Sequence, residues 1–129
     1  MSGWAAWLPQ ITGYGFAGGA LVASNGAFLA ASPGYQMTAA ECMDIVKKFG
    51  NPALFNSSPN TFAGQKYLAL RCNDQVAEFK SGDKGISSFR TKKGTVVICF
   101  YNGSSAVQNP SQAGGVATKV QAVFDNSGI

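Results

Sequence analysis

A helical spacing of apolar residues extends from position 37 to position 50. Ile45 and Phe49 lie about one turn apart, so they fall on the same side of a helix. Thr38 stands at the expected N-cap, and Glu41 follows three residues later, which is the spacing of a capping box. The segment therefore predicts an amphipathic helix with a well-defined start.

Both ends of the chain also predict helices. Near the N-terminus, Trp4 and Trp7 are three residues apart and share one side of a short helix, for which Ser2 is a candidate cap. Pro9 lacks a backbone donor, so this helix is expected to kink or to end early. Near the C-terminus, apolar residues recur at helical spacing and predict a helix over residues 111–124.

Short apolar or alternating runs, separated by turn residues, predict the strands. The dipeptide Asn25-Gly26 predicts a type I′ turn between two such runs. Further turn signals divide the middle of the chain into an antiparallel meander. Its last run is almost wholly apolar and predicts an interior strand covered on both faces. The expected strands are 19–24, 27–32, 65–72, 75–80, 85–91 and 95–101.

The order of these elements predicts an α+β fold, taken as one domain over residues 1–129. We expect a central antiparallel β-sheet of about six strands. The N- and C-terminal helices are expected to pack together on one face, with the further helix on the other face. Hydrophobic residues make up 46% of the chain, which is ample for one core. Glycines and a proline interrupt every apolar run before it reaches the length of a membrane span.

The charged and nucleophilic residues limit the kinds of partner and reaction that we expect for this chain. The net charge of +4 favours an acidic partner. The chain has no histidine, which removes the commonest general base and the commonest metal ligand. The six acidic residues are dispersed and there is no glycine-rich nucleotide loop, so we expect no enzymatic activity, no cofactor and no metal. Cys42, Cys72 and Cys99 are expected to be buried free thiols in a reducing cytosol.

Segments along the chain resemble the profilin family, and they include the hairpin NGAFLAASPG and the last helix after NPSQAGG. SGWAAWL resembles the family's opening, and MTAAECMDIVKKF resembles its second helix. TFAGQKYLALR is similar to a sheet segment with a Gly-x-Lys pattern, and KKGTVVICFY resembles the strand before the last loop. The resemblance extends over nearly the whole chain. It implies a monomeric, cytoplasmic, cytoskeleton-associated protein that binds monomeric actin, regulates filament assembly and binds proline-rich proteins.

The resemblance places the binding of proline-rich segments between the two terminal helices. The indoles of Trp4 and Trp7 supply flat faces and N–H donors, which suit a polyproline II helix. Leu29 stands where relatives carry a tryptophan, and Val123 stands where they carry a tyrosine or a histidine. The chain ends in Ile129 instead of a tyrosine. We therefore expect weak binding. The expected contact residues are Trp4, Trp7, Leu29, Val123, Phe124 and Ile129.

The resemblance also implies an actin-binding surface with a few apolar contacts inside a basic rim. Arg71 can form a forked contact with a carboxylate of an acidic partner. The expected contact residues are Lys66, Ala69, Arg71, Lys80, Lys84, Ser111, Gly114, Gly115 and Lys119. A candidate site for a phosphoinositide headgroup consists of Lys80, Lys84, Arg90, Lys92 and Lys93.

A second class of function fits the same order of elements. Small α+β modules of the longin, roadblock or PAS type also place helices around an antiparallel sheet, and a fold alone does not define a function. Such a module would use its sheet face for a small ligand or for dimerisation. The paired tryptophans and the TFAGQKYLALR segment favour the profilin interpretation over this alternative.

Overall fold

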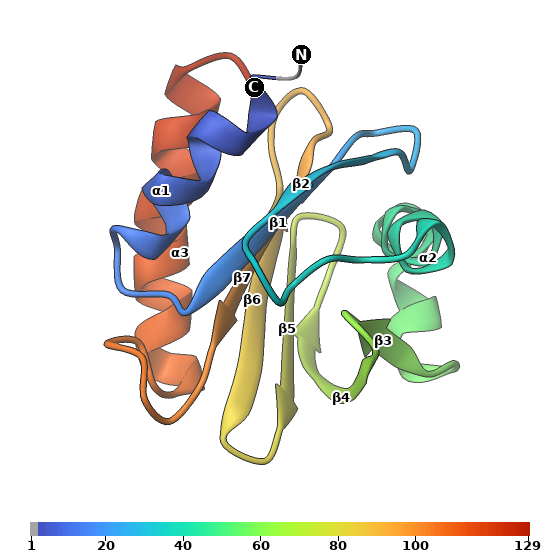
Figure 1. Cartoon of the computed structure of the whole chain (residues 1–129). Coiled ribbons are helices and arrows are strands. Elements are labelled where there is room, and N and C mark those ends of the chain that lie inside the picture. The colour runs from blue at the N-terminus through green and yellow to red at the C-terminus, as the bar shows by residue number, and fades with distance from the viewer. Residues whose placement is uncertain (1–2) are drawn as a thin grey trace.

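Seven strands form one continuous sheet in the computed structural model, which describes residues 3–129 (Figure 1). Every pair of neighbouring strands is antiparallel. Across the sheet the order is β2-β1-β7-β6-β5-β4-β3. The strands are β1 (Gly18–Val22), β2 (Phe28–Ala31), β3 (Asn60–Phe62), β4 (Gln65–Cys72), β5 (Val76–Ser81), β6 (Lys84–Arg90) and β7 (Val96–Tyr101).

Helices cover both faces of this sheet. Figure 1 shows α1 and α3 side by side on one face and α2 on the opposite face. The expected α+β arrangement is therefore confirmed. No helix between residues 3 and 129 is long and apolar enough to cross a membrane. The helices are η1 (Trp4–Trp7, 3₁₀), α1 (Leu8–Thr12), α2 (Ala39–Gly50), η2 (Pro52–Asn56, 3₁₀) and α3 (Pro110–Asn126).

The sheet separates two hydrophobic clusters. The cluster on the α2 side takes Ile45 and Phe49 from the helix and Phe79 from β5. The cluster on the α3 side takes Val120 and Phe124 from the helix and Phe89 from β6. All six residues of β7 are buried because the strand lies between both clusters, as the apolar run predicted. Each helix is thus held to the sheet mainly by its apolar stripe.

The start of α2 is fixed by the expected capping box. The Thr38 hydroxyl accepts a hydrogen bond from the Glu41 backbone N–H at 3.1 Å. The Glu41 carboxylate accepts one from the Thr38 backbone N–H at 3.0 Å. Two backbone donors that the helix itself cannot pair are thereby satisfied.

The N-terminal helical segment changes type along its length. Residues Trp4–Trp7 form a 3₁₀ turn, and the α-helical hydrogen bonds begin only at Leu8. Pro9 lies in the first turn of α1, where its missing N–H is tolerated, and the helix ends at Thr12. The expected cap at Ser2 lies outside the described residues.

Two turns differ from the expectations. Asn25 does not have a positive φ, and only Gly26 does (89°), so the expected type I′ turn is wrong. Instead, the Asn25 side-chain carbonyl accepts a hydrogen bond from Ala27 N–H at 3.0 Å. The segment before β4 also contains the short strand β3, which the sequence did not predict. Its turn uses Ala63 and Gly64, both with positive φ (51° and 80°).

Lys48 is buried in the last turn of α2, on the same side of the helix as Ile45. Its side chain is 2% exposed and donates to the Asp44 carboxylate at 2.8 Å. It also donates to the Pro59 carbonyl at 2.7 Å and to the Asn60 side-chain oxygen at 3.0 Å. A buried ammonium needs such partners to replace water. These bonds tie the end of α2 to the start of β3.

Candidate functional site

The two ends of the chain bring apolar side chains together on the α1/α3 face of the sheet. Trp4 and Trp7 come from η1, Leu29 from β2 and Ile129 from the C-terminus, and all four are half-buried. All four pack against the α3-side cluster. We call Trp4, Trp7, Leu29, Val123 and Ile129 the terminal surface. A half-buried indole keeps part of its ring available to a ligand while the rest anchors it to the core.

The Trp7 ring packs against Phe124, an aromatic side chain of α3. The centroids of the Trp7 and Phe124 rings are 5.5 Å apart, with the planes tilted by 45°. Phe124 is 0% exposed and also packs edge-on against Phe89. The expectation that Phe124 contacts a ligand is therefore wrong, because the side chain is sealed inside the core. It positions Trp7 instead.

The C-terminus is held to the same end of the sheet by hydrogen bonds. The Thr91 hydroxyl donates to the Ile129 backbone carbonyl at 2.7 Å. The Lys92 backbone N–H donates to the Asp125 carboxylate at 2.9 Å. Val123 lies on the last turns of α3, half-buried, as the helical period places it. Ile129 is thereby fixed beside the terminal helices, as the sequence interpretation requires.

A second surface lies on the part of β4 and β5 that α3 leaves uncovered. Leu68 lies directly opposite Lys80 in the register, and Lys66 is two residues before Leu68, so the three side chains share one face. Leu68 is 76% exposed and Leu70 is 50% exposed. Together with the two lysines they line a groove. Sequence reasoning missed both leucines, although the strand alternation placed Leu68 on the exposed side with Lys66.

Arg71 belongs to the same surface and connects it with α3. Its Nε lies 3.3 Å from the Glu78 carboxylate in the neighbouring strand. A Cβ placed on Gly114 would come within 3.0 Å of the other oxygen of that carboxylate. Glu78 therefore lies between Arg71 and the first turns of α3. The Arg71 side chain remains 67% exposed, so most of the guanidinium stays available to a partner.

The N-terminal half of α3 completes this second surface. Ser111, Gly115 and Lys119 are four residues apart, lie along one side of the helix and are exposed. Gly114 faces Glu78 of β5. We call the whole set the basic surface; it consists of Lys66, Leu68, Leu70, Arg71, Lys80, Ser111, Gly114, Gly115 and Lys119.

Two expected members do not share this face. Ala69 follows Leu68 in the strand, so it points to the opposite side, where it packs against the α2-side cluster. Lys84 lines a cavity on that same opposite side with Tyr35 and Phe100. The expectation that Ala69 and Lys84 join one contact surface with Lys66 and Arg71 is therefore wrong.

The expected phosphoinositide cluster is divided between two ends of the sheet. Lys80 and Lys84 flank the β5–β6 turn, whereas Arg90 lies at the other end of β6. Lys84 and Arg90 are six positions apart along an extended strand, a span of about 20 Å. Arg90 lines a hollow with Lys92 and Lys93, and its guanidinium lies 5.9 Å from the centre of the Phe49 ring. A headgroup site stays a prediction, confined to these three cations.

The cysteines are free, and two of them match the expected burial. Cys42 and Cys99 are buried, whereas Cys72 is half-buried, which corrects the expectation for that residue. Burial raises the pKa of the Cys99 thiol, so it stays protonated and unreactive at neutral pH. Burial is also the main cause of the raised pKa of Cys72, with the Glu78 carbonyl lowering it in part.

A comparison with protein families matches the profilin family model to residues 2–129. Among curated proteins, the profilin of Saccharomyces cerevisiae is 31% identical over 119 residues, which cover 91% of this chain and 88% of the yeast protein. The profilin of Bombyx mori is 32% identical over 101 residues, covering 78% of this chain and 77% of the insect protein.

Solved structures share the fold at lower identity. Acanthamoeba castellanii profilin IB superimposes with a TM-score of 0.87 at 22% identity, covering 98% of this chain and 99% of that one. Mouse profilin IIa, solved with a double repeat from the FH1 domain of mDia1, gives 0.73 at 19% identity and covers 99% and 100%. LokiProfilin1, solved with rabbit actin, gives 0.66 at 11% identity and covers 98% and 97%. Given the match along nearly its whole length, this chain belongs to the profilin family.

Proposed function

We propose that this protein binds monomeric actin through the basic surface and proline-rich segments through the terminal surface, and thereby regulates filament assembly in the cytoplasm. The observation that supports the proposal is that the molecule carries two separate surfaces with accessible apolar side chains. The terminal surface presents the indoles of Trp4 and Trp7, where the two ends of the chain meet. The basic surface presents Leu68 and Leu70, which are surrounded by lysine and arginine side chains. A protein with both can hold an actin monomer and a proline-rich protein at the same time.

The terminal surface has the chemistry that a polyproline II helix needs. Such a ligand has little conformational entropy left to lose and exposes backbone carbonyls along its length. The rings of Trp4 and Trp7 offer apolar faces for prolines, and an indole N–H can donate to a carbonyl. Mouse profilin IIa, which was solved with FH1 repeats, supports assigning this ligand class to the same fold.

The side chains of the terminal surface also indicate a weak affinity for proline-rich segments. Leu29, Val123 and Ile129 fill space but offer no flat ring and no side-chain donor. Each missing aromatic contact is worth about 1 kcal/mol, which is close to a fivefold change in affinity. We therefore assign proline-rich segments as weak ligands that depend on the two tryptophans.

The basic surface has the composition of a protein interface. Its apolar centre at Leu68 and Leu70 is surrounded by Lys66, Arg71 and Lys80. Exposed apolar contacts inside a charged rim are typical of a specific partner site, and the positive rim favours an acidic partner. LokiProfilin1, which was solved with rabbit actin, supports actin as that partner. Family membership also favours a binding protein over an enzyme and over a longin, roadblock or PAS module.

Arg71→Glu and Leu68→Ser test the actin assignment. Both side chains are mostly exposed, so both variants are expected to fold, with melting curves close to the wild type. Each should lower the affinity for monomeric actin about fivefold or more, measured from the delay of pyrene-actin assembly. Lys47→Glu provides the control, because Lys47 is exposed on α2 at the other face. Unchanged assembly curves for both test variants would remove the basic surface from the proposal.

A further inference from the structure

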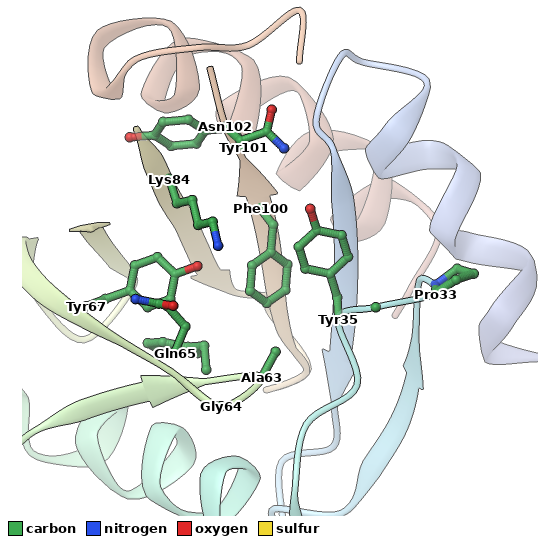
Figure 2. A pocket seen from close by; sticks show the side chains of 12 residues that line it. Pro33, Tyr35, Ala63, Gly64, Gln65, Tyr67, Lys84, Phe100, Tyr101 and Asn102 are labelled. Atoms are coloured by element: carbon green, nitrogen blue, oxygen red, sulfur yellow. The ribbon is translucent and has the colours of Figure 1, made fainter. Parts of the chain in front are cut away.

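A cavity opens on the α2 side of the sheet, away from both surfaces described above. Its volume is about 430 Å³, and it lies where four segments meet. These are the β2–α2 connection, the β3–β4 turn, the start of β6 and the end of β7 (Figure 2). The side chains that matter most are Tyr35, Phe62, Tyr67, Lys84, Phe100 and Asn102.

Aromatic rings form the walls of this cavity. The rings of Tyr35 and Phe100 are 4.5 Å apart between centroids, and their planes differ by 35°. Tyr67 stands nearly perpendicular to Phe62 at 5.8 Å. The Tyr35 ring rests directly on Gly18, where a Cβ would come within 2.4 Å of the ring. The walls are therefore held in place by packing, and aromatic side chains line the cavity.

One cation reaches into the space between these rings. Figure 2 shows the Lys84 ammonium extending toward the gap between Tyr67 and Phe100. Lys84 forms no ion pair with any residue between positions 3 and 129. No carboxylate side chain from this described range lines the cavity. Lys84 is exposed and its charge is solvated, and an unpaired ammonium beside these aromatic rings favours an anionic ligand over a cationic one.

The tyrosine hydroxyls add neutral donors. Within the described residues, neither the Tyr35 nor the Tyr67 hydroxyl is hydrogen-bonded to the protein. Burial, with a smaller contribution from Tyr35, raises the pKa of Tyr67 to about 12. The Tyr67 hydroxyl therefore keeps its proton at neutral pH and can donate it in a hydrogen bond to an anionic oxygen.

The rim of the cavity is a strained turn that a distant carboxylate holds in place. Among residues 3–129, Ala63 is the non-glycine residue with a positive φ (51°). The Glu41 carboxylate accepts hydrogen bonds from the backbone N–H groups of Ala63 (3.2 Å) and Gly64 (2.9 Å). The same carboxylate caps α2. Strain of this kind persists only where surrounding contacts fix it, and it occurs preferentially at ligand sites.

We propose that this cavity binds a small aromatic anion, a single planar ring carrying a phosphate or a carboxylate. The ring would lie against Tyr35 and Phe100, and the anionic group would meet the Lys84 ammonium and the Tyr67 hydroxyl. The cavity volume lies at the lower end of the range for small-molecule sites, which suits one ring and not a dinucleotide. This cavity opens on the other face of the sheet from the proposed actin and proline-rich sites, and it shares Tyr67 with the groove at Leu68 and Leu70.

Phenyl phosphate tests this proposal in a nitrogen-15 NMR titration of the full chain. We expect saturable shifts of the backbone amides of Tyr35, Gly64 and Phe100. Benzylammonium, which has the opposite charge, and inorganic phosphate, which lacks the ring, should each bind at least about tenfold more weakly. Binding should weaken further with added salt, because Lys84 is solvent-accessible.

Two variants test the contribution of the cation and that of the stacking ring separately. Lys84→Gln should weaken phenyl phosphate binding about fivefold or more, and Tyr35→Leu should do the same by removing the stacking face. Lys47→Gln, which removes an exposed charge on α2 outside the cavity, should leave the binding unchanged. The proposal fails if phenyl phosphate produces no saturable shifts at the cavity, or if benzylammonium binds equally well. It also fails if Lys84→Gln and Lys47→Gln have equal effects.

Discussion

Replacing the buried lysine of α2 gives a sharp test of how the fold is held together. Lys48→Met keeps the aliphatic part of the side chain and removes the ammonium that joins α2 to the segment before β3. Two of its acceptors, the Pro59 carbonyl and the Asn60 side-chain oxygen, then lose their donor. Asn60 is only 5% exposed, so water cannot readily take the place of the ammonium.

The change in the free energy of unfolding depends on the acceptors that lose their hydrogen-bond donor. An unpaired buried polar group destabilises the folded state by about 1–3 kcal/mol, and the buried Asn60 side-chain oxygen becomes one, whereas the Pro59 carbonyl is only partly buried and can regain water. Burying a methyl group in place of a charge offsets part of this, because the ammonium no longer has to leave water. We therefore expect the free energy of unfolding to fall by about 2 kcal/mol. Asp44 contributes little to this figure, since its side chain is 43% exposed and regains water.

Urea unfolding followed by circular dichroism measures this change. Lys47→Met is the matched control, because it makes the same substitution one position earlier, at an exposed site in the same turn. The control should change the free energy of unfolding by less than about 0.5 kcal/mol. If Lys48→Met is no less stable than Lys47→Met, the reasoning about buried donors is refuted for this protein.

Three further predictions concern stability. Thr38→Ala should lower the free energy of unfolding by about 1 kcal/mol in urea unfolding, because it removes one half of the capping box. Phe124→Ala should lower it by about 3–5 kcal/mol and shift the tryptophan emission to longer wavelength, because Trp7 loses its support. Burial raises the pKa of Tyr67 from 10 to about 12, so the folded state favours the neutral phenol. The resulting stability is level below about pH 9 and falls by about 1.4 kcal/mol by pH 11. Unfolding measured against pH should show a smaller alkaline loss in Tyr67→Phe.

The local signals in the sequence were enough for the three α-helices and most strands, but not for the 3₁₀ helix η2. The capping box at Thr38 and Glu41 depends on residues three apart, so the sequence alone specifies it. The apolar run of β7 likewise predicted an interior strand because both of its faces are covered. By contrast, β3 has only three residues, and its turn has a positive φ at Ala63. That turn depends on a carboxylate 22 residues earlier in the chain, which no local pattern reveals.

The partner surfaces were predicted less completely. Helical spacing could not tell which of Val123 and Phe124 faces the core, because that depends on the contacts of Phe124 with Trp7 and Phe89. Ala69 pairs with Phe79 and Arg71 pairs with Glu78 across the bulge between them, so the two residues lie on different faces of the sheet. The aromatic cavity draws its side chains from four separate segments, so only the folded chain brings them together.

A fluorescence titration with a proline peptide tests the main functional claim most directly. The chain contains two tryptophans, and both lie on the terminal surface, so any change in emission reports on that surface. With a peptide of ten or more prolines, we expect a saturable change at high micromolar to millimolar concentration, and its loss in Trp7→Leu. A glycine-serine peptide of equal length should have no effect. An emission spectrum that the proline peptide leaves unaltered at millimolar concentration would contradict the assignment of proline-rich ligands to the joined ends of this chain.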